Sequence, residues 1–169
     1  LPYTATEPRT EQRFRMSYEA YLDWCDEDTH AEWVNGEVIV FMPPLLEHQS
    51  IIGFLHRLIA AFVEMFDLGQ VIMAPFEMQL VPGRISREPD LIFMTHAHMS
   101  RLTRERIIGP ADLVIEMVSP SSTTRDRRDK FQDYQSGGVR EYWIIDPRPG
   151  KQRAEFYQLD VQGRYQAMA

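Results

Sequence analysis

The stretch LVIEMVSPSS, residues 113–122, places one carboxylate in a run that otherwise reads as the middle of a buried strand. Strand side chains alternate between two faces, and both faces here are apolar apart from Glu116: Leu113, Ile115 and Met117 on one, Val114 and Val118 on the other. Such a run is typical of a central strand covered on both sides. An unpaired carboxylate buried there costs several kcal/mol, so an arginine, a proton or a metal ion must compensate it.

The composition predicts one globular domain. The chain has 169 residues and 44% hydrophobic content, and no segment has the roughly 20 consecutive apolar residues of a membrane span. We expect a flexible N-terminal arm over residues 1–16, one domain over residues 17–169, and a cytoplasmic location. The single cysteine excludes intramolecular disulfides and a thiolate metal cluster. With 25 Asp and Glu against 18 Lys and Arg, the net negative charge argues against nonspecific nucleic-acid binding by the surface as a whole.

Hydrophobic periodicity and turn signals predict an α/β fold with a mixed sheet flanked by helices. Helices are expected over residues 17–25, over 46–67 and within 121–138, and a hairpin with an Asn-Gly turn over 31–43. The remaining predicted strands cover residues 71–81, 88–94, 112–118 and 140–147, and a closing hairpin follows from residue 153. A polar connection is expected from about residue 95 to 109.

Two carboxylates of neighbouring predicted strands form a candidate metal site. Asp90 follows Pro89 at the entrance to the strand that begins PDLIFM, and Glu116 lies within the next long strand. Carboxylates from adjacent strands can converge on one point, and such hard oxygen ligands suit Mg²⁺ or Mn²⁺. A bound ion would neutralise Glu116 and support hydrolysis of a phosphate ester.

Lys130 is the third candidate. Only Lys130 and Lys151 are lysines in a chain that otherwise uses arginine. On the predicted helix, Lys130 shares a face with Tyr134, the side that should pack on the sheet. Its ammonium could therefore reach toward Glu116 and position a water or balance charge on a phosphate.

These motifs together resemble a known family. The stretches that carry the resemblance are PDL at 89–91, DLVIEMVSPSS at 112–122 and RDRRDKFQDYQSGGVREYWIIDP at 125–147, with AEWVNGEV and PPLLEHQSIIG before them. Through these stretches the chain resembles the Uma-type family of restriction endonucleases within the PD-(D/E)XK nuclease superfamily. The resemblance covers about residues 17–165. It implies a central mixed sheet with a helix on each side, and Mg²⁺-dependent cleavage of DNA, with Mn²⁺ as a possible substitute. A domain of this kind that cuts both strands would normally act as a homodimer.

By this resemblance, Asp90 and Glu116 are the motif acids, and a main-chain carbonyl at Met117 completes the metal ligands. The superfamily pattern places a lysine two residues after the second acid, where this chain has Val118. Members of the family look alike in placing that lysine on the following helix, where Lys130 stands. Two further candidates occupy positions similar to those of the family: Glu37 as a supporting acid and His48 as a phosphate or water contact.

Three rival interpretations stay open. The chain could be an inactive nucleic-acid-binding or regulatory module that keeps the nuclease fold, a reading that the acidic charge and Val118 favour. It could be a small phosphohydrolase acting on nucleotides. A purely structural domain would instead pair Glu116 with an arginine and hold no ion. The segment RDRRD at 125–129 could be a ridge that contacts phosphates or a solvated helix face with ion pairs.

Overall fold

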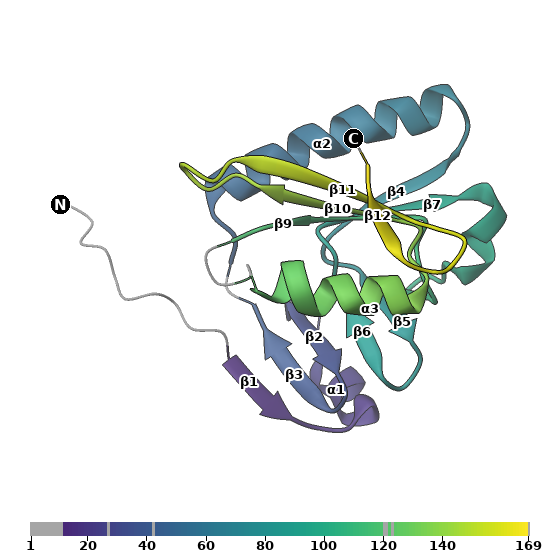
Figure 1. The fold of residues 1–169 in the computed structure, drawn as a ribbon. Coiled ribbons are helices and arrows are strands. Elements are labelled where there is room, and N and C mark those ends of the chain that lie inside the picture. The colour runs from purple at the N-terminus through teal and green to yellow at the C-terminus, as the bar shows by residue number, and fades with distance from the viewer. Residues whose placement is uncertain (1–11, 27, 42, 120–121, 123, 169) are drawn as a thin grey trace.

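The strands form two mixed layers. The computed structural model describes residues 12–26, 28–41, 43–119, 122 and 124–168. Within these ranges, one six-stranded sheet has the order β1-β3-β2-β6-β5-β8 and a second has the order β12-β11-β10-β9-β7-β4. We call them sheet A and sheet B. Figure 1 shows sheet B in the upper part of the molecule and most of sheet A below it.

Sheet A is built largely from the N-terminal half of the chain. Its strands are β1 (Gln12–Arg15), β2 (Ala31–Val34), β3 (Glu37–Val40), β5 (Glu77–Val81), β6 (Ile85–Arg87) and β8 (Arg106–Ile108). The predicted hairpin is β2 and β3, and its turn places Asn35 and Gly36 at positive φ, as a two-residue hairpin turn requires. Helix α1 (Tyr18–Trp24) begins as predicted after Ser17, whose Oγ accepts a hydrogen bond from the amide of Ala20 at 3.2 Å.

Sheet B carries the strand with which the sequence analysis began. Its strands are β4 (Gly69–Met73), β7 (Leu91–Thr95), β9 (Leu113–Met117), β10 (Glu141–Asp146), β11 (Arg153–Leu159) and β12 (Tyr165–Ala167). Strand β9 is central: it pairs with β10 in parallel and with β7 in antiparallel fashion. All five of its residues are buried, which confirms the prediction of a strand covered on both faces.

Helices cover the two faces of sheet B. Helix α2 (Leu46–Met65) packs on the face that contains Leu113 and Ile115. On the opposite face lie a π-helical segment η2 (Arg125–Asp129) and helix α3 (Lys130–Gly137), which ends at Gly138 with φ of +87°. Figure 1 shows α3 between sheet B and sheet A, and α2 on the outer side of sheet B. The predicted α/β class, with helices on both sides of a mixed sheet, is confirmed.

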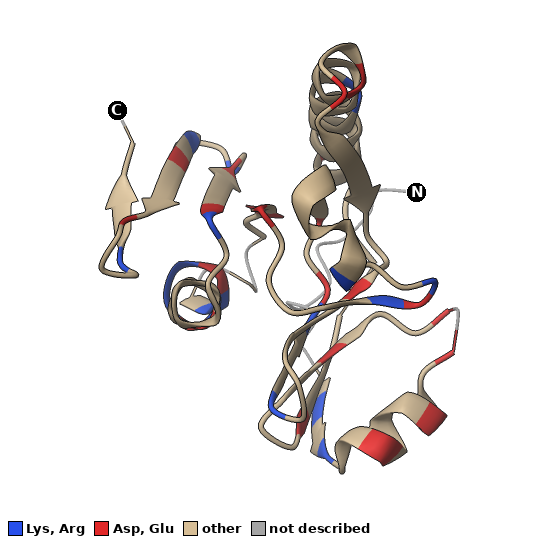
Figure 2. Cartoon of the chain, turned by 90° about the vertical axis from the view of Figure 1, so that its right-hand side faces the viewer, with Lys and Arg blue, Asp and Glu red and all other residues tan. Residues whose placement is uncertain are grey.

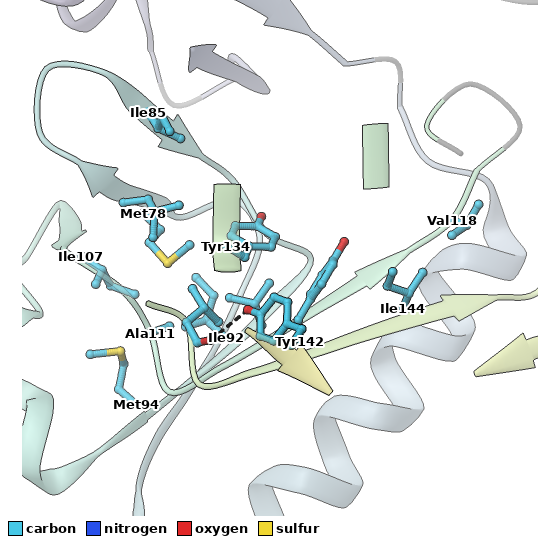
Figure 3. Packing of buried hydrophobic residues seen from close by; sticks show 14 residues of the cluster. Met78, Ile85, Ile92, Met94, Ile107, Ala111, Val118, Tyr134, Tyr142 and Ile144 are labelled. Atoms are coloured by element: carbon cyan, nitrogen blue, oxygen red, sulfur yellow. Dashed lines mark hydrogen bonds between the residues drawn. The ribbon is translucent and has the colours of Figure 1, made fainter. Parts of the chain in front are cut away.

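The main core fills the space between sheet B, α3 and sheet A. Tyr134 of α3 and Tyr142 of β10 are both fully buried, with ring centroids 4.9 Å apart in an edge-to-face arrangement. Figure 3 shows these two rings beside each other, with Met78 and Ile107 of sheet A nearby. The core therefore ties α3 to both sheets and fixes the direction in which its side chains point.

The structure differs from the sequence analysis in three places. The strand predicted over residues 71–81 is two strands, β4 and β5, which belong to different sheets and are separated by a break at Pro75. The polar connection after residue 95 contains a 3₁₀ helix, η1 (His96–Arg101), and strand β8. Residues 12–15 of the predicted flexible arm form β1, which pairs with β3, and residues 1–11 of that arm lie outside the described residues.

Candidate active site

Asp90 and Glu116 face each other across two paired strands. Strands β7 and β9 pair with Leu91 opposite Ile115, and this register continued by one residue places Asp90 opposite Glu116. Asp90 Oδ2 accepts a hydrogen bond of 2.7 Å from the amide of Met117, the residue after Glu116. The pairing of the strands therefore brings together the two carboxylates that the sequence predicted.

Lys130 reaches the two carboxylates from helix α3, which packs on sheet B. It is the first residue of α3, and its Nζ donates to Glu116 Oε1 at 2.7 Å. The same Nζ lies 2.9 Å from Glu32 Oε1 and 3.8 Å from Asp126 Oδ1. Tyr134, one helical turn after Lys130, donates its hydroxyl to Glu116 Oε1 at 2.6 Å. The rival prediction that an arginine neutralises Glu116 is wrong, because its partners are a lysine and a tyrosine.

Glu32 is a member of the cluster that the sequence analysis did not single out. It lies on β2 with no exposed surface, and its Oε2 accepts from Arg87 at 2.7 Å while Oε1 accepts from the amide of Glu88 at 3.2 Å. Arg87 also donates to Asp133 of α3. The signal that could have found Glu32 is the one that marked Glu116, a lone acid inside an otherwise apolar strand, AEWV.

The charges of the cluster act on one another. Burial raises the pKa of Glu116 well above its usual range, and the nearby carboxylates of Asp90 and Asp126 add to this effect against the attraction of Lys130. Burial would also raise the pKa of Glu32, but the positive charges of Lys130 and Arg87 outweigh it and hold that pKa below normal. Burial opposes the charge of Lys130, yet the surrounding carboxylates raise its pKa. Lys130 is therefore a permanent ammonium, and Glu116 is the acid that holds a proton most readily.

The donor set fits a hard divalent cation. Within the described residues, Oδ1 of Asp90 and Oε2 of Glu116 have no hydrogen-bond partner, since both acids use their other oxygen. Asp126 Oδ2 is buried and also lacks one. The N–H and C=O of one strand residue point to the same side, so the carbonyl of Met117 faces Asp90 as its amide does. No cluster of three or more His, Cys, Asp or Glu side chains suited to a metal occurs among the described residues. Mg²⁺ does not require such a cluster, because it keeps several waters and needs only one or two carboxylates.

The two weaker candidates lie in different places. His48, in the first turn of α2, has its Nε2 3.3 Å from Asp90 Oδ2, and its buried Nδ1 has no partner. Glu37, on β3, is 39% exposed and pairs with Arg13 at 3.0 Å. Glu37 lines a cavity of about 380 Å³ whose wall also includes Arg87, but it does not join the buried cluster. The structure thus brings together Asp90, Glu116, Lys130 and His48, and it does not bring Glu37 to them.

The RDRRD segment matches neither of the alternatives that its sequence left open in full. Asp126 is buried beside Lys130, and Arg125 is buried with its guanidinium carbon 4.8 Å from the ring centre of Phe41. Arg127 is tied by ion pairs to Asp146, at 3.1 Å, and to Glu155. The segment is therefore neither a fully solvated face nor a simple exposed ridge, since two of its five residues, Arg125 and Asp126, are buried.

The comparisons with known proteins assign the family. A model of the Uma2 family, described as "Putative restriction endonuclease", matches residues 18–169. The chain belongs to this family. A crystal structure of a "putative nuclease belonging to DUF820" from Anabaena variabilis is similar to this fold, with a TM-score of 0.66 and 18% sequence identity, over 85% of this chain and 84% of that chain. None of the curated proteins matches the sequence.

Membership of the Uma2 family confirms the resemblance that the sequence motifs indicated, and the solved neighbour confirms the fold to which they pointed. Within the described residues, no helix is both long enough and apolar enough to cross a membrane.

Proposed function

We propose that this protein is a metal-dependent endonuclease that hydrolyses DNA phosphodiester bonds with Asp90, Glu116 and Lys130. The observation that carries the proposal is the convergence of these three side chains from β7, β9 and α3. Membership of a family described as restriction endonucleases supports the reaction class. Three carboxylates, those of Glu32, Glu116 and Asp126, are buried around one ammonium, a costly arrangement that a purely structural role does not require.

The residues that would hold the metal are Asp90, Glu116 and the main-chain carbonyl of Met117, with Mg²⁺ as the natural ion and Mn²⁺ as a substitute. When bound, such an ion lowers the pKa of a coordinated water and neutralises charge that develops on the phosphate. Glu116 must be ionised to bind a cation, and its raised pKa makes this step dependent on pH.

Lys130 would act as a cation and not as a base, because its pKa is raised and it stays protonated. Its contacts with Glu116 and Glu32 fix the ammonium in place before substrate arrives, which is the condition for electrostatic catalysis. There it orients Glu116 and offers positive charge to the reacting phosphate. His48, 3.3 Å from Asp90, would orient that carboxylate or contact a substrate oxygen.

The proposed substrate is DNA, and the proposed working unit is a homodimer. The net charge of −7 opposes general adhesion to DNA, so binding would rest on local cations. Arg13, Arg15 and Arg125 line the cavity of about 380 Å³ beside the cluster and supply such cations. One active site faces one strand at a time, so cleavage of both strands calls for a homodimer.

The test combines a cleavage assay with a measurement of metal binding. The purified chain is incubated with supercoiled plasmid in Mg²⁺ or Mn²⁺, and Mn²⁺ affinity is measured separately by calorimetry. We expect Asp90→Asn and Glu116→Gln to weaken Mn²⁺ binding. We expect these two variants, and also Lys130→Met, each to lower the rate of cleavage by about 100-fold or more. Glu105→Gln, at an acid that is 76% exposed and makes none of the contacts of the cluster, is the matched control and should change neither.

Three outcomes would contradict the proposal in distinct ways. Mn²⁺ affinity unchanged in Asp90→Asn and Glu116→Gln would place any metal elsewhere. DNA binding without cleavage in any divalent metal would favour the inactive module. Hydrolysis of mononucleotides, with no salt-dependent affinity for DNA, would favour the small phosphohydrolase.

A further inference from the structure

Helix α2 carries an exposed apolar stripe beside the face that it packs on sheet B. The helix buries Ile52 and Val63, but Phe54, Leu58, Phe62 and Met65 are each more than half exposed. Figure 2, which looks nearly along this helix at the top of the view, shows its charged residues on one side and the rest uncharged. Contiguous exposed apolar surface of this kind usually marks an interaction site.

The spacing of the stripe is that of a helix–helix seam. Apolar residues recur at alternating intervals of three and four: Ile51, Phe54, Leu58, Ala61 and Met65. We call these five residues the α2 seam. A repeat of 3.5 residues is the pattern of a two-helix coiled coil, in which each side chain inserts between side chains of a second helix. The natural occupant of this face is therefore another α-helix and not an irregular peptide.

The charges beside the seam favour a helix over a lipid surface. Helices that lie on anionic membranes carry several lysines or arginines on the polar face. The charged residues of α2 are Glu47, Arg57 and Glu64, which sum to −1. An acidic helix of this kind is repelled by an anionic bilayer, so lipid is the less favoured occupant.

The seam is complementary to itself in one antiparallel register. When Leu58 packs against Ala61 of a second copy, two-fold symmetry places Phe54 against Met65, so that a large side chain meets a small one at the centre. In the same register Arg57 lies beside Glu64 of the second copy, and the symmetry forms this ion pair twice. Within the described residues Arg57 and Glu64 are exposed and have no ion-pair partner of their own. A shift by one heptad would instead place Arg57 beside Arg57.

The area of this face is consistent with a dimer only if the groove beside the helix takes part. A helix of 20 residues is about 30 Å long and about 10 Å wide, which gives roughly 300 Å² in projection. A stable interface buries about 800 Å² on each partner. A groove of about 480 Å³ continues the seam toward sheet B, lined by Leu58 and Phe62 on the helix and by Leu113 and Trp143 on the sheet.

We infer that the α2 seam and this groove bind the same surface of a second copy of the chain, with the two α2 helices antiparallel. The second copy is the partner that the proposed function calls for, but the inference rests on the surface of α2. His48, near the active site, is about 11 residues from the two-fold axis, so the two sites lie at opposite ends of the paired helices and share no residues.

Molecular mass in solution tests the inference. We expect light scattering after gel filtration to give twice 19.8 kDa for the full chain, and Leu58→Arg to weaken dimerisation by at least about 100-fold because it buries a charge in the seam. Val161→Arg, at an apolar residue that is 97% exposed outside α2, is the matched control and should stay dimeric. Circular dichroism would show that both variants are folded.

A charge exchange tests the register. Arg57→Glu alone should weaken the dimer, and Arg57→Glu combined with Glu64→Arg should restore it. Failure of the double variant to recover would overturn the antiparallel register. A wild-type chain that is monomeric at a concentration of about 100 μM would overturn the whole inference, as would a monomer that binds anionic vesicles. A dimer that does not cleave DNA would refute the proposed function and leave this inference intact.

Discussion

Replacement of Lys130 by methionine is the perturbation that most directly examines the buried cluster. Methionine keeps most of the length of the side chain and removes the charge. Lys130 is 3% exposed, and its Nζ lies within 4 Å of carboxylate oxygens of Glu32, Glu116 and Asp126. The variant would leave three carboxylates, none more than 3% exposed, without their shared cation.

The magnitude follows from the cost of breaking a buried ion pair. Removal of one partner typically costs about 3–5 kcal/mol, because the remaining charge stays buried. We therefore expect the free energy of unfolding at pH 8 to fall by about 4 kcal/mol, which for a domain of this size lowers Tm by about 10 °C. Glu116 can relieve part of this cost, since burial already raises its pKa and favours uptake of a proton.

The dependence on pH has a definite sign. Without Lys130, the pKa of both Glu32 and Glu116 in the folded protein rises, and the pKa of Glu116, which burial already holds above its usual value, moves further above the unfolded value. The folded state then binds more protons than the unfolded state, so stability is lost as pH rises from about 4.5 upward. Lys130→Met should therefore be less destabilising at pH 5 than at pH 8.

The assay is urea unfolding followed by tryptophan fluorescence at both pH values. Lys151→Met, at the other lysine, which is exposed, is the matched control and should lie within about 0.5 kcal/mol of the wild type. Lys130→Met combined with Glu116→Gln should recover at least half of the loss, because glutamine is neutral and can still accept from Tyr134. A loss below about 1 kcal/mol, or strictly additive single effects, would refute the coupling of these groups.

Three further predictions concern the metal, a neighbouring histidine and a close approach of strands. Mn²⁺ affinity measured by calorimetry should rise between about pH 5 and pH 8, because Glu116 has a raised pKa and must release its proton; an affinity independent of pH would contradict this. His48→Ala should weaken Mn²⁺ binding by about 10-fold or more through the loss of its contact with Asp90, the proposed metal ligand, while thermal unfolding changes little. Gly69→Ala should lower the free energy of unfolding by more than about 3 kcal/mol, since the added Cβ would collide with the main chain at Met94. Gly83→Ala, also at positive φ but in open space, should cost only about 1–2 kcal/mol. Equal urea midpoints for the two variants would show that the β4–β7 contact is looser than described.

The parts of the fold that the sequence predicted are those governed by local pattern. The alternation in residues 113–118 placed Glu116 on the face opposite Ile115, and the structure has Ile115 against α2 and Glu116 against α3. Helical spacing likewise directed Lys130 toward the sheet. These predictions succeeded because periodicity alone determines which residues of one element share a face.

The parts that the sequence did not predict depend on contacts between distant elements. Residues 71–81 are mostly apolar, with Glu77 and Gln79 as the polar exceptions, and read as one strand, although Pro75 cannot donate to a ladder and marks the break between sheets A and B. Glu32 enters the site only because β2 of sheet A lies against α3, which no local pattern reveals. The partners of a buried acid are thus harder to predict than the acid itself.

The position of Lys130 has a packing explanation. Val118 shares a face with Glu116 and is 1% exposed within the main core. A lysine at that position would have to bury its ammonium among apolar side chains, at a cost of several kcal/mol. From α3 the ammonium instead reaches Glu116 Oε1 at 2.7 Å and Glu32 Oε1 at 2.9 Å, so both its charge and its hydrogen bonds are satisfied. The helix can therefore supply the lysine only because Glu32 of sheet A supports it from the other side, which makes Glu32 as necessary to the position of the ammonium as Glu116.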